Sequence, residues 1–183
     1  MEIEAVLFDL GNTLTASASL AASLAHLARS PTLKDLKLDG KQLNELGQEI
    51  ERQIGRLYQA GQVQQPDWLS VWQSALSRCG LNFNPREAEL LCRAHLGQFV
   101  SECKVEPTSI PLLAALHKAK ISLALVSNAT GPVDIFDRDL RQKGLASFFG
   151  LSFGHLPSAT ENQILESFKR HSTGSACLPA RPY

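Results

Sequence analysis

The segment Val6-Leu7-Phe8-Asp9-Leu10-Gly11-Asn12-Thr13-Leu14 is the most informative part of this sequence about its fold. The residues before Asp9 form a short apolar run rich in strand formers, which is typical of a strand buried on both faces. Asp9 ends this run, and a Gly-Asn turn follows it. Open α/β sheets bind their ligands beyond the carboxyl ends of parallel strands, so Asp9 is a candidate site residue. The alternative is a strand-end aspartate that only caps the next turn.

A second apolar run, at residues 121–126, predicts another buried strand. Ser127-Asn128-Ala129 follows it, so short polar side chains again stand at the tip of a strand, ahead of a helical stretch. The alternative role for Ser127 and Asn128 is that of helix caps and nothing more. The combination of the two strand tips is more informative than either one alone.

The motifs F-D-x-G-N-T-L at 8–14 and L-V-S-N-A at 125–129 occur in the order and spacing of one superfamily. The chain resembles the haloacid dehalogenase-like (HAD) hydrolases, whose first motif is D-x-D-x-T and whose second is a strand ending in Ser or Thr. The resemblance implies an α/β fold in which an α-helical bundle cap is inserted into a Rossmann-like HAD core with a parallel sheet. We expect that sheet to be truncated at the C-terminus.

Composition narrows the class of protein further. The 183 residues are 44% hydrophobic, as in globular chains, and 18 basic residues balance 18 acidic ones. This balance gives no electrostatic footprint for nucleic acid or an anionic membrane. We expect no signal peptide, because the N-terminus is acidic and runs directly into the first apolar run, and the four cysteines show no C-x-x-C spacing. We therefore expect a cytoplasmic protein with reduced thiols and a small-molecule substrate; no motif specifies an oligomeric state.

Helical periodicity dominates the chain after Thr13. It predicts helices over 17–29, 41–60 and 86–103, and a further helix that opens at Pro66-Asp67. We assign residues 15–104 to the helical cap, and residues 1–14 and 105–154 to the HAD-like core. We expect the large aromatic residues Trp68, Trp72 and Phe99 to form the core of the cap rather than a substrate site. We expect His26 and His95 to lie among apolar residues and to have structural roles.

The second half of the predicted core has helices at 110–120 and 133–143, and a short third strand at 148–154. The aspartates of the later helix are interspersed with Arg138 and Arg141, which indicates a solvated outer face rather than a metal site. These aspartates are Asp134, Asp137 and Asp139.

The resemblance ends at Gly154. HAD proteins continue with a lysine in a K-P-x-x-x-x-F context and a strand ending in G-D, but residues 155–183 contain neither. Residues 160–169 can be back-translated to codons, and these codons can be read two bases out of register. The shifted reading permits the sequence Arg-Lys-Pro-Asp-Pro-Arg-Ile-Phe-Gln, which contains the missing lysine motif. We hypothesise that the reading frame changes near residue 154, so that 155–183 is an atypical, frameshifted tail. Codons in the coding DNA that forbid this reading would refute the hypothesis.

The resemblance also implies roles for individual residues. Asp9 would be the nucleophile that forms a covalent aspartyl intermediate, and Mg²⁺ would bridge it to the backbone carbonyl of Gly11. We expect weak Mg²⁺ binding because the later acidic ligand is lacking. The transferring group would be held by Thr13, by Ser127 and by the amide groups around Asn128, with Asn12 as a further polar contact.

Gly11 departs from the family pattern, because HAD phosphatases place an aspartate there as a general acid and base. Dehalogenases of the family also lack that aspartate, since a halide leaves without a proton. The leading interpretation is a HAD-like phosphatase that acts on a small phosphate ester through an aspartyl intermediate, with impaired activity. The alternatives are a haloacid dehalogenase that uses the same Asp9, and a non-catalytic relative or fragment that binds ligands or partners through its cap.

Overall fold

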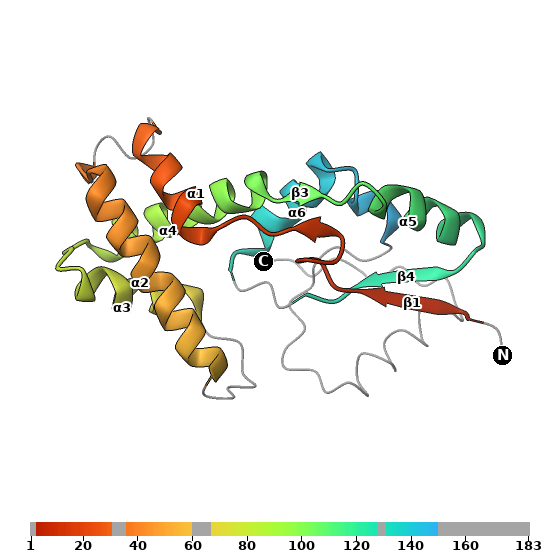
Figure 1. Ribbon diagram of the computed structural model, residues 1–183, viewed down its shortest axis with the longest axis horizontal. Coiled ribbons are helices and arrows are strands. Elements are labelled where there is room, and N and C mark those ends of the chain that lie inside the picture. Colours follow the sequence, from red (N-terminus) through yellow and green to blue (C-terminus); the bar gives the residue numbers. More distant parts are fainter. Residues whose placement is uncertain (1–2, 31–35, 60–66, 128–130, 150–183) are drawn as a thin grey trace, which may run out of the picture. The chain divides into compact units, whose positions relative to one another are not determined.

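The computed structural model describes residues 3–30, 36–59, 67–127 and 131–149 (Figure 1). The chain divides into two compact units, Met1–Phe153 and Gly154–Tyr183, and all described residues belong to the first unit. The atypical tail and the predicted site residue Asn128 therefore lie outside the described residues. Within the described part, no helix combines the length and the apolar character needed to cross a membrane.

Two strands form the sheet that carries the first motif. Strand β1 (Ala5–Phe8) pairs in parallel with β4 (Ser122–Leu125), and Phe8 lies opposite Leu125 (Figure 1). One further bond extends the pairing, because the Val126 amide donates to the Phe8 carbonyl at 2.8 Å. The carboxyl ends of both strands therefore lie side by side, as the sequence predicts. Both tips can thus contribute to one ligand site.

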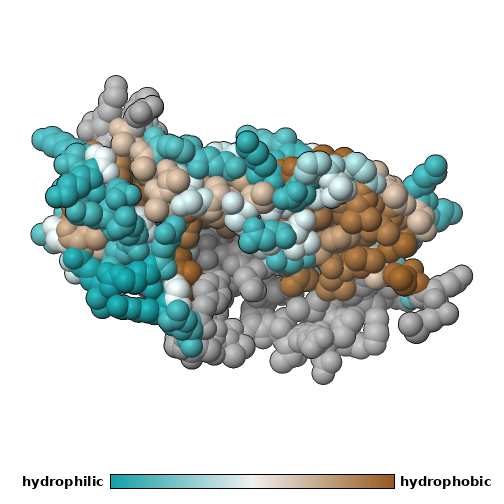
Figure 2. All heavy atoms as spheres, viewed as in Figure 1, coloured by the Kyte–Doolittle hydropathy of each residue, from teal (hydrophilic) through white to brown (hydrophobic). Residues whose placement is uncertain are grey.

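Strand β1 is not buried on both faces, so this expectation was wrong for the described structure. Val6 and Phe8 pack on one face against the core cluster, whereas Leu7, on the opposite face, is 43% exposed. The physical reason is that side chains alternate between the two faces of a strand, and the described core packs against only one of them. Figure 2 shows apolar surface over the region of β1, β4 and α5 (Ser109–Lys118), where Ile110 and Leu112 are also exposed.

The four helices predicted for the cap are all present. They are α1 (Leu20–His26), which continues as a 3₁₀ turn at Leu27–Arg29, α2 (Gly40–Gln59), α3 (Trp68–Arg78) and α4 (Pro85–Glu102). Polar side chains cap all four of these helices at their N-termini, and on α2 the Asp39 Oδ1 accepts the Gln42 amide at 2.8 Å. Ser19 caps α1, Asp67 caps α3, and Asn84 with Glu87 forms a capping box on α4.

The bundle has its own apolar core, because each helix turns one apolar stripe inward. Trp72 is fully buried in this core together with leucines and isoleucine from α1, α2 and α4: Leu24, Leu43, Leu46, Ile50 and Leu91. The connections to the sheet run antiparallel as β2 (Thr15–Ala16) and β3 (Lys104–Val105), with Thr15 opposite Val105. They lie where we assigned the boundary between core and cap, although the assignment itself stays a prediction.

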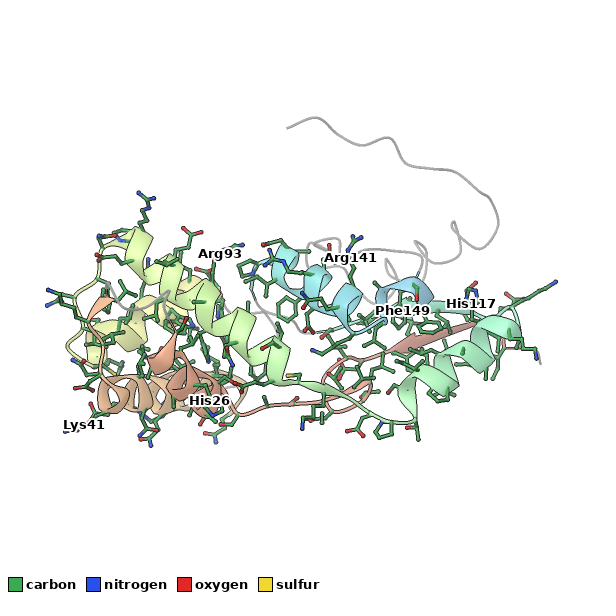
Figure 3. The ribbon with its side chains drawn as sticks, turned by 90° about the horizontal axis from the view of Figure 1, so that it is seen from above. His26, Lys41, Arg93, His117, Arg141 and Phe149 are labelled. Atoms are coloured by element: carbon green, nitrogen blue, oxygen red, sulfur yellow. The ribbon has the colours of Figure 1, made fainter. Side chains whose placement is uncertain are left out.

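The two histidines of the cap differ from each other. His95 is fully buried in the bundle, as expected, and its Nε2 donates to the Leu20 carbonyl at 2.8 Å. His26 does not lie among apolar residues, so that expectation was wrong. Its side chain is 64% exposed, and its Nδ1 lies 2.7 Å from Glu102 of α4. Figure 3 shows His26 on the side of the molecule formed by the cap helices.

The second half of the core follows the predicted order up to α6 (Val133–Gln142). Leu113 of α5, Leu123 of β4 and Leu140 of α6 form the centre of its apolar cluster. A 3₁₀ helix follows at Ala146–Phe148, so the strand predicted for 148–154 is wrong at Phe148 and Phe149, the two of its residues that the structure describes. Leu145 is fully buried in the cluster, and this burial fixes a tight turn instead of an extended segment. Residues 150–154 lie outside the described residues.

Candidate active site

The turn after β1 determines which first-motif side chains can reach a ligand. The Leu10 carbonyl accepts hydrogen bonds from the amides of Leu14 and Thr15 at 3.0 and 2.9 Å, and from the Thr15 hydroxyl at 3.2 Å. Asn12 adopts a positive φ of 57°, which an asparagine tolerates better than most residues. The chain thus folds back on itself within a few residues, and Leu14 is buried while Asn12 and Thr13 remain exposed.

A cavity of about 320 Å³ opens beyond the carboxyl ends of β1 and β4. Asp9 lines it from the tip of β1, and Ser127 lines it from the tip of β4. The turn after β1 and the first connection to the cap supply the rest of this polar wall: Leu10, Gly11, Thr15 and Ser17. The two strand-tip residues of the sequence prediction therefore share one cavity.

All four cap helices contribute apolar side chains to the lining, and we call these side chains the apolar wall. They are Leu20, Ile54, Trp68, Leu96, Phe99 and Val100. Trp68 is 7% exposed and belongs to the cap core as expected, but it lines this cavity as well. Phe99 is only partly buried, packs against a separate cluster and also lines the cavity, so the prediction of a place in the cap core holds for Trp68 and not for Phe99.

Asp139 of α6 is a second carboxylate in the lining of the cavity. It is 9% exposed, and Lys143 binds its Oδ2 while also donating to the Val100 carbonyl. Burial raises the pKa of Asp139, although the Lys143 ammonium opposes that shift. The interaction with Lys143 holds the carboxylate in place at low exposure, where an unpaired charge would be costly.

The predicted outer face of α6 was wrong for Asp139, although it holds for Asp134. The side chain of Asp134 is 52% exposed and forms an ion pair with Arg93 of α4, which is labelled in Figure 3. The two aspartates are separated by five positions, and at 3.6 residues per turn these positions point to different faces of a helix. A pattern of interspersed charges therefore did not distinguish the inward aspartate from the outward one.

The structure brings together some of the predicted site residues and not others. Asp9, Gly11 and Ser127 line the cavity. Asn12 and Thr13 are exposed and do not line it, and the Asn12 Oδ1 instead accepts the Ser17 amide at 3.2 Å. Sequence reasoning did not single out Thr15, Ser17, Cys103, Phe136 and Asp139 as cavity residues. The polar residues just past Leu14 were the only available signal for the first two.

The donor set can be compared with the needs of a metal ion. Among the described residues, no group of three or more His, Cys, Asp or Glu side chains could hold one. Mg²⁺ prefers oxygen ligands, usually keeps several waters, and is commonly bound through one or two carboxylates together with substrate phosphates. Asp9 and Gly11 both line the cavity, and a carboxylate and a backbone carbonyl are oxygen donors of the kind that Mg²⁺ binds.

Solved structures with the same architecture are HAD proteins. The HAD-hydrolase YfnB from Bacillus subtilis, described as bound to magnesium, is 19% identical, with a TM-score of 0.53 over 82% of this chain and 64% of that chain. A predicted phosphoglycolate phosphatase from Haemophilus somnus 129PT is 18% identical, with a TM-score of 0.53 over 92% and 72%. A protein described as a phosphatase from Clostridium difficile is 17% identical, with a TM-score of 0.52 over 96% and 73%.

The chain therefore has the HAD-like α/β fold with a helical cap, which confirms the fold predicted from the two motifs. It spans less than two thirds of the YfnB chain. No protein-family model matches the sequence, and no curated protein sequence matches it. At these identities the similarity concerns the fold, so the activity has to be argued from the cavity.

Proposed function

We propose that this chain is a cytoplasmic HAD-like hydrolase that cleaves a small phosphate ester through a covalent intermediate on Asp9. The observation that carries the proposal is the shared cavity of Asp9 and Ser127 at the ends of two parallel strands. A carboxylate at this position can attack a bound ester, and a neighbouring hydroxyl can donate a hydrogen bond to the oxygens of the transferring group.

The proposed reaction has two steps. A carboxylate oxygen of Asp9 forms a bond to phosphorus, and the bond from phosphorus to the alcohol oxygen breaks. Water then attacks the phosphorus of the aspartyl phosphate, which releases inorganic phosphate and restores the Asp9 carboxylate. Mg²⁺ bound to Asp9 and the Gly11 carbonyl would neutralise negative charge on the transferring group.

The hydroxyl groups of the polar wall have different roles in this proposal. The Thr15 hydroxyl already donates to the Leu10 carbonyl, so we assign contact with the phosphate to Ser17 and Ser127. Thr13, Asn12 and the amides around Asn128 stay predicted contacts from the family resemblance.

Gly11 supplies no side chain that could protonate the leaving alcohol. A missing general acid and base costs about two to four orders of magnitude in rate. We therefore propose an impaired phosphatase that turns over esters of acidic alcohols faster than simple alkyl esters, because a good leaving group needs no proton.

The test is phosphate release from 4-nitrophenyl phosphate in the presence of Mg²⁺. We expect measurable turnover by the original chain and none above background by Asp9→Asn. Glu89→Gln is the matched control, since it removes an exposed carboxylate on α4 outside the cavity, and it should retain full activity. Equal rates for the original chain and Asp9→Asn would refute the proposal and leave the non-catalytic binding role.

Gly11 also supports a second candidate function, a haloacid dehalogenase. A halide leaves without a proton, so the missing side chain has no cost in that reaction. Asp9 would displace the halide from carbon, and water would hydrolyse the resulting ester. Halide release from 2-chloropropionate that disappears in Asp9→Asn, without phosphate release from any ester, would favour this candidate over the phosphatase.

A further inference from the structure

The cavity has one polar end and one apolar wall. Asp9, Ser17 and Ser127 lie at the polar end, next to the strand tips. The four cap helices contribute only apolar side chains to the lining, one or more from each helix: Leu20, Ile54, Trp68, Leu96, Phe99 and Val100. A bound ester whose phosphate lies at Asp9 would therefore extend its alcohol portion along an apolar surface.

The charged residues among the described lining of the cavity are all acidic. Asp9 and Asp139 are acidic, and none of the described residues that line the cavity is basic. Lys143 is the cation next to this lining, but its ammonium is already bound by the Asp139 carboxylate and the Val100 carbonyl. A second anionic group on the substrate would therefore lose water without gaining a cationic partner from the described lining, and burial of an unpaired charge is unfavourable.

We propose that the substrate is a phosphate monoester whose alcohol portion is uncharged and apolar, of the size of a single ring or a short branched chain. This inference rests on the proposed phosphatase function. The size follows from the volume of about 320 Å³, which lies at the lower end of the range of about 300–1,000 Å³ for ligand cavities. Esters that carry a carboxylate, such as phosphoglycolate, are disfavoured by the same cavity.

The first experiment compares three alkyl esters whose leaving groups are similar: benzyl phosphate, glycerol 3-phosphate and phosphoglycolate. We expect kcat/KM to be highest for benzyl phosphate, and to exceed that for phosphoglycolate by about 100-fold or more, as for a buried charge left without a partner. Turnover of phosphoglycolate that equals or exceeds that of benzyl phosphate would overturn the inference and leave the phosphatase function standing.

The second experiment removes one apolar side chain of the wall. Phe99→Ala should raise KM for benzyl phosphate by roughly 10- to 100-fold, because several buried carbons lose their contact with the substrate. It should leave KM for glycerol 3-phosphate within about twofold, because that alcohol gains little from an apolar wall. Leu90→Ala is the matched control on the same helix, since Leu90 is 44% exposed and lies outside the lining. An equal rise for both esters would indicate a structural effect and count against the inference.

The third experiment measures binding without catalysis. Benzylphosphonate, which cannot be hydrolysed at the phosphorus–carbon bond, should bind more tightly than phosphonoacetate in calorimetric titrations of the original chain. Tighter binding of benzylphosphonate by a chain that releases no phosphate would support the apolar site and refute the phosphatase function. Tighter binding of phosphonoacetate, or no binding of benzylphosphonate, would overturn the inference whatever the activity.

Discussion

Asp9 and Ser127 follow two hydrogen-bonded parallel strands whose last paired residues are Phe8 and Leu125, and both side chains line one cavity. The sheet thus fixes a carboxylate and a hydroxyl at the same edge, on backbone that is hydrogen-bonded up to Val126. Backbone held in this way limits how far either group can move away from a bound ester. This relationship makes Ser127 the first position to test after Asp9.

Ser127→Ala should lower kcat/KM for phosphate esters by roughly 10- to 100-fold. A hydrogen bond to a charged group contributes about 1.5–3 kcal/mol, and the variant removes the donor at the polar end of the cavity. Ser127→Thr keeps the hydroxyl and should recover most of the activity. The measurement is steady-state phosphate release, and an alanine variant with unchanged kcat/KM would contradict the role of this hydroxyl.

Gly47→Ala should destabilise the chain by about 1–3 kcal/mol, because an overpacked contact costs that much. A Cβ atom at Gly47 would lie 2.8 Å from the Cα of Ala21, so α1 and α2 would have to separate. Gly55→Ala on the same helix is the control, since nothing lies within 4 Å of its Cβ position. It should stabilise by roughly 0.5–1 kcal/mol through helix propensity. Urea unfolding compares the two variants, and effects of the same sign would contradict the packing argument.

Glu102 should make the stability depend on pH in the acidic range. Burial raises its pKa, but hydrogen bonds from Gln98, Ser23 and His26, at 2.6, 2.6 and 2.7 Å, outweigh this effect, so the pKa is lowered from 4.5. A lowered carboxyl pKa gives stability that is present above the unfolded value and is lost as the pH falls through the folded value. Glu102→Gln should be less stable by about 1–2 kcal/mol at pH 7, and its stability should change less below pH 4.5.

Unfolding curves at pH 7 and pH 3 measure this difference. Glu89→Gln serves as the control, because Glu89 is an exposed carboxylate on the same helix. An original chain and a Glu102→Gln variant that lose equal stability between the two pH values would contradict the prediction.

His95 should make the stability of the chain depend on pH in a higher pH range than Glu102 does. Burial lowers its pKa from 6.5, and this outweighs the hydrogen bond to Leu20 and the charges of Glu102 and Glu51, which raise it. The unfolded chain therefore binds more protons below pH 6.5, and stability falls as the pH decreases from that value. The slope is at most about 1.4 kcal/mol per pH unit for one proton. His95→Gln should flatten the stability between pH 6.5 and pH 5, whereas His117→Gln, at an exposed position on α5, should not.

Lys143→Met should destabilise the chain by about 3–5 kcal/mol, because it leaves the buried Asp139 carboxylate without its cation. The double variant Asp139→Asn with Lys143→Met should recover most of this loss, since no charge then remains unpaired. Thermal unfolding of the two single variants and the double variant gives the coupling between the residues. Additive effects would show that the two side chains do not interact in solution.

Several features of the site were predictable because they depend on local sequence. The apolar runs that end at Asp9 and Ser127 predict strands and place both residues at strand ends. Helical periodicity predicts the cap helices within a few positions, and the Pro66-Asp67 pair predicts the start of α3. Other features depend on which face of a strand or helix packs against another part of the chain. The exposure of Leu7 and the inward position of Asp139 follow from packing partners that are distant in sequence.

Local sequence was sufficient to predict the cap helices and the two strands that end near Asp9 and Ser127, because backbone preferences and residue chemistry act over a few positions. The positions of Trp68 and Phe99 in the lining of the cavity, and the burial of Asp139 against Lys143, depend on tertiary contacts. The sequence pattern of a helix such as α6 is compatible with either an inward or an outward position of a residue such as Asp139. Burial of apolar area between distant segments selects one of them, and that free energy exists only once the segments meet.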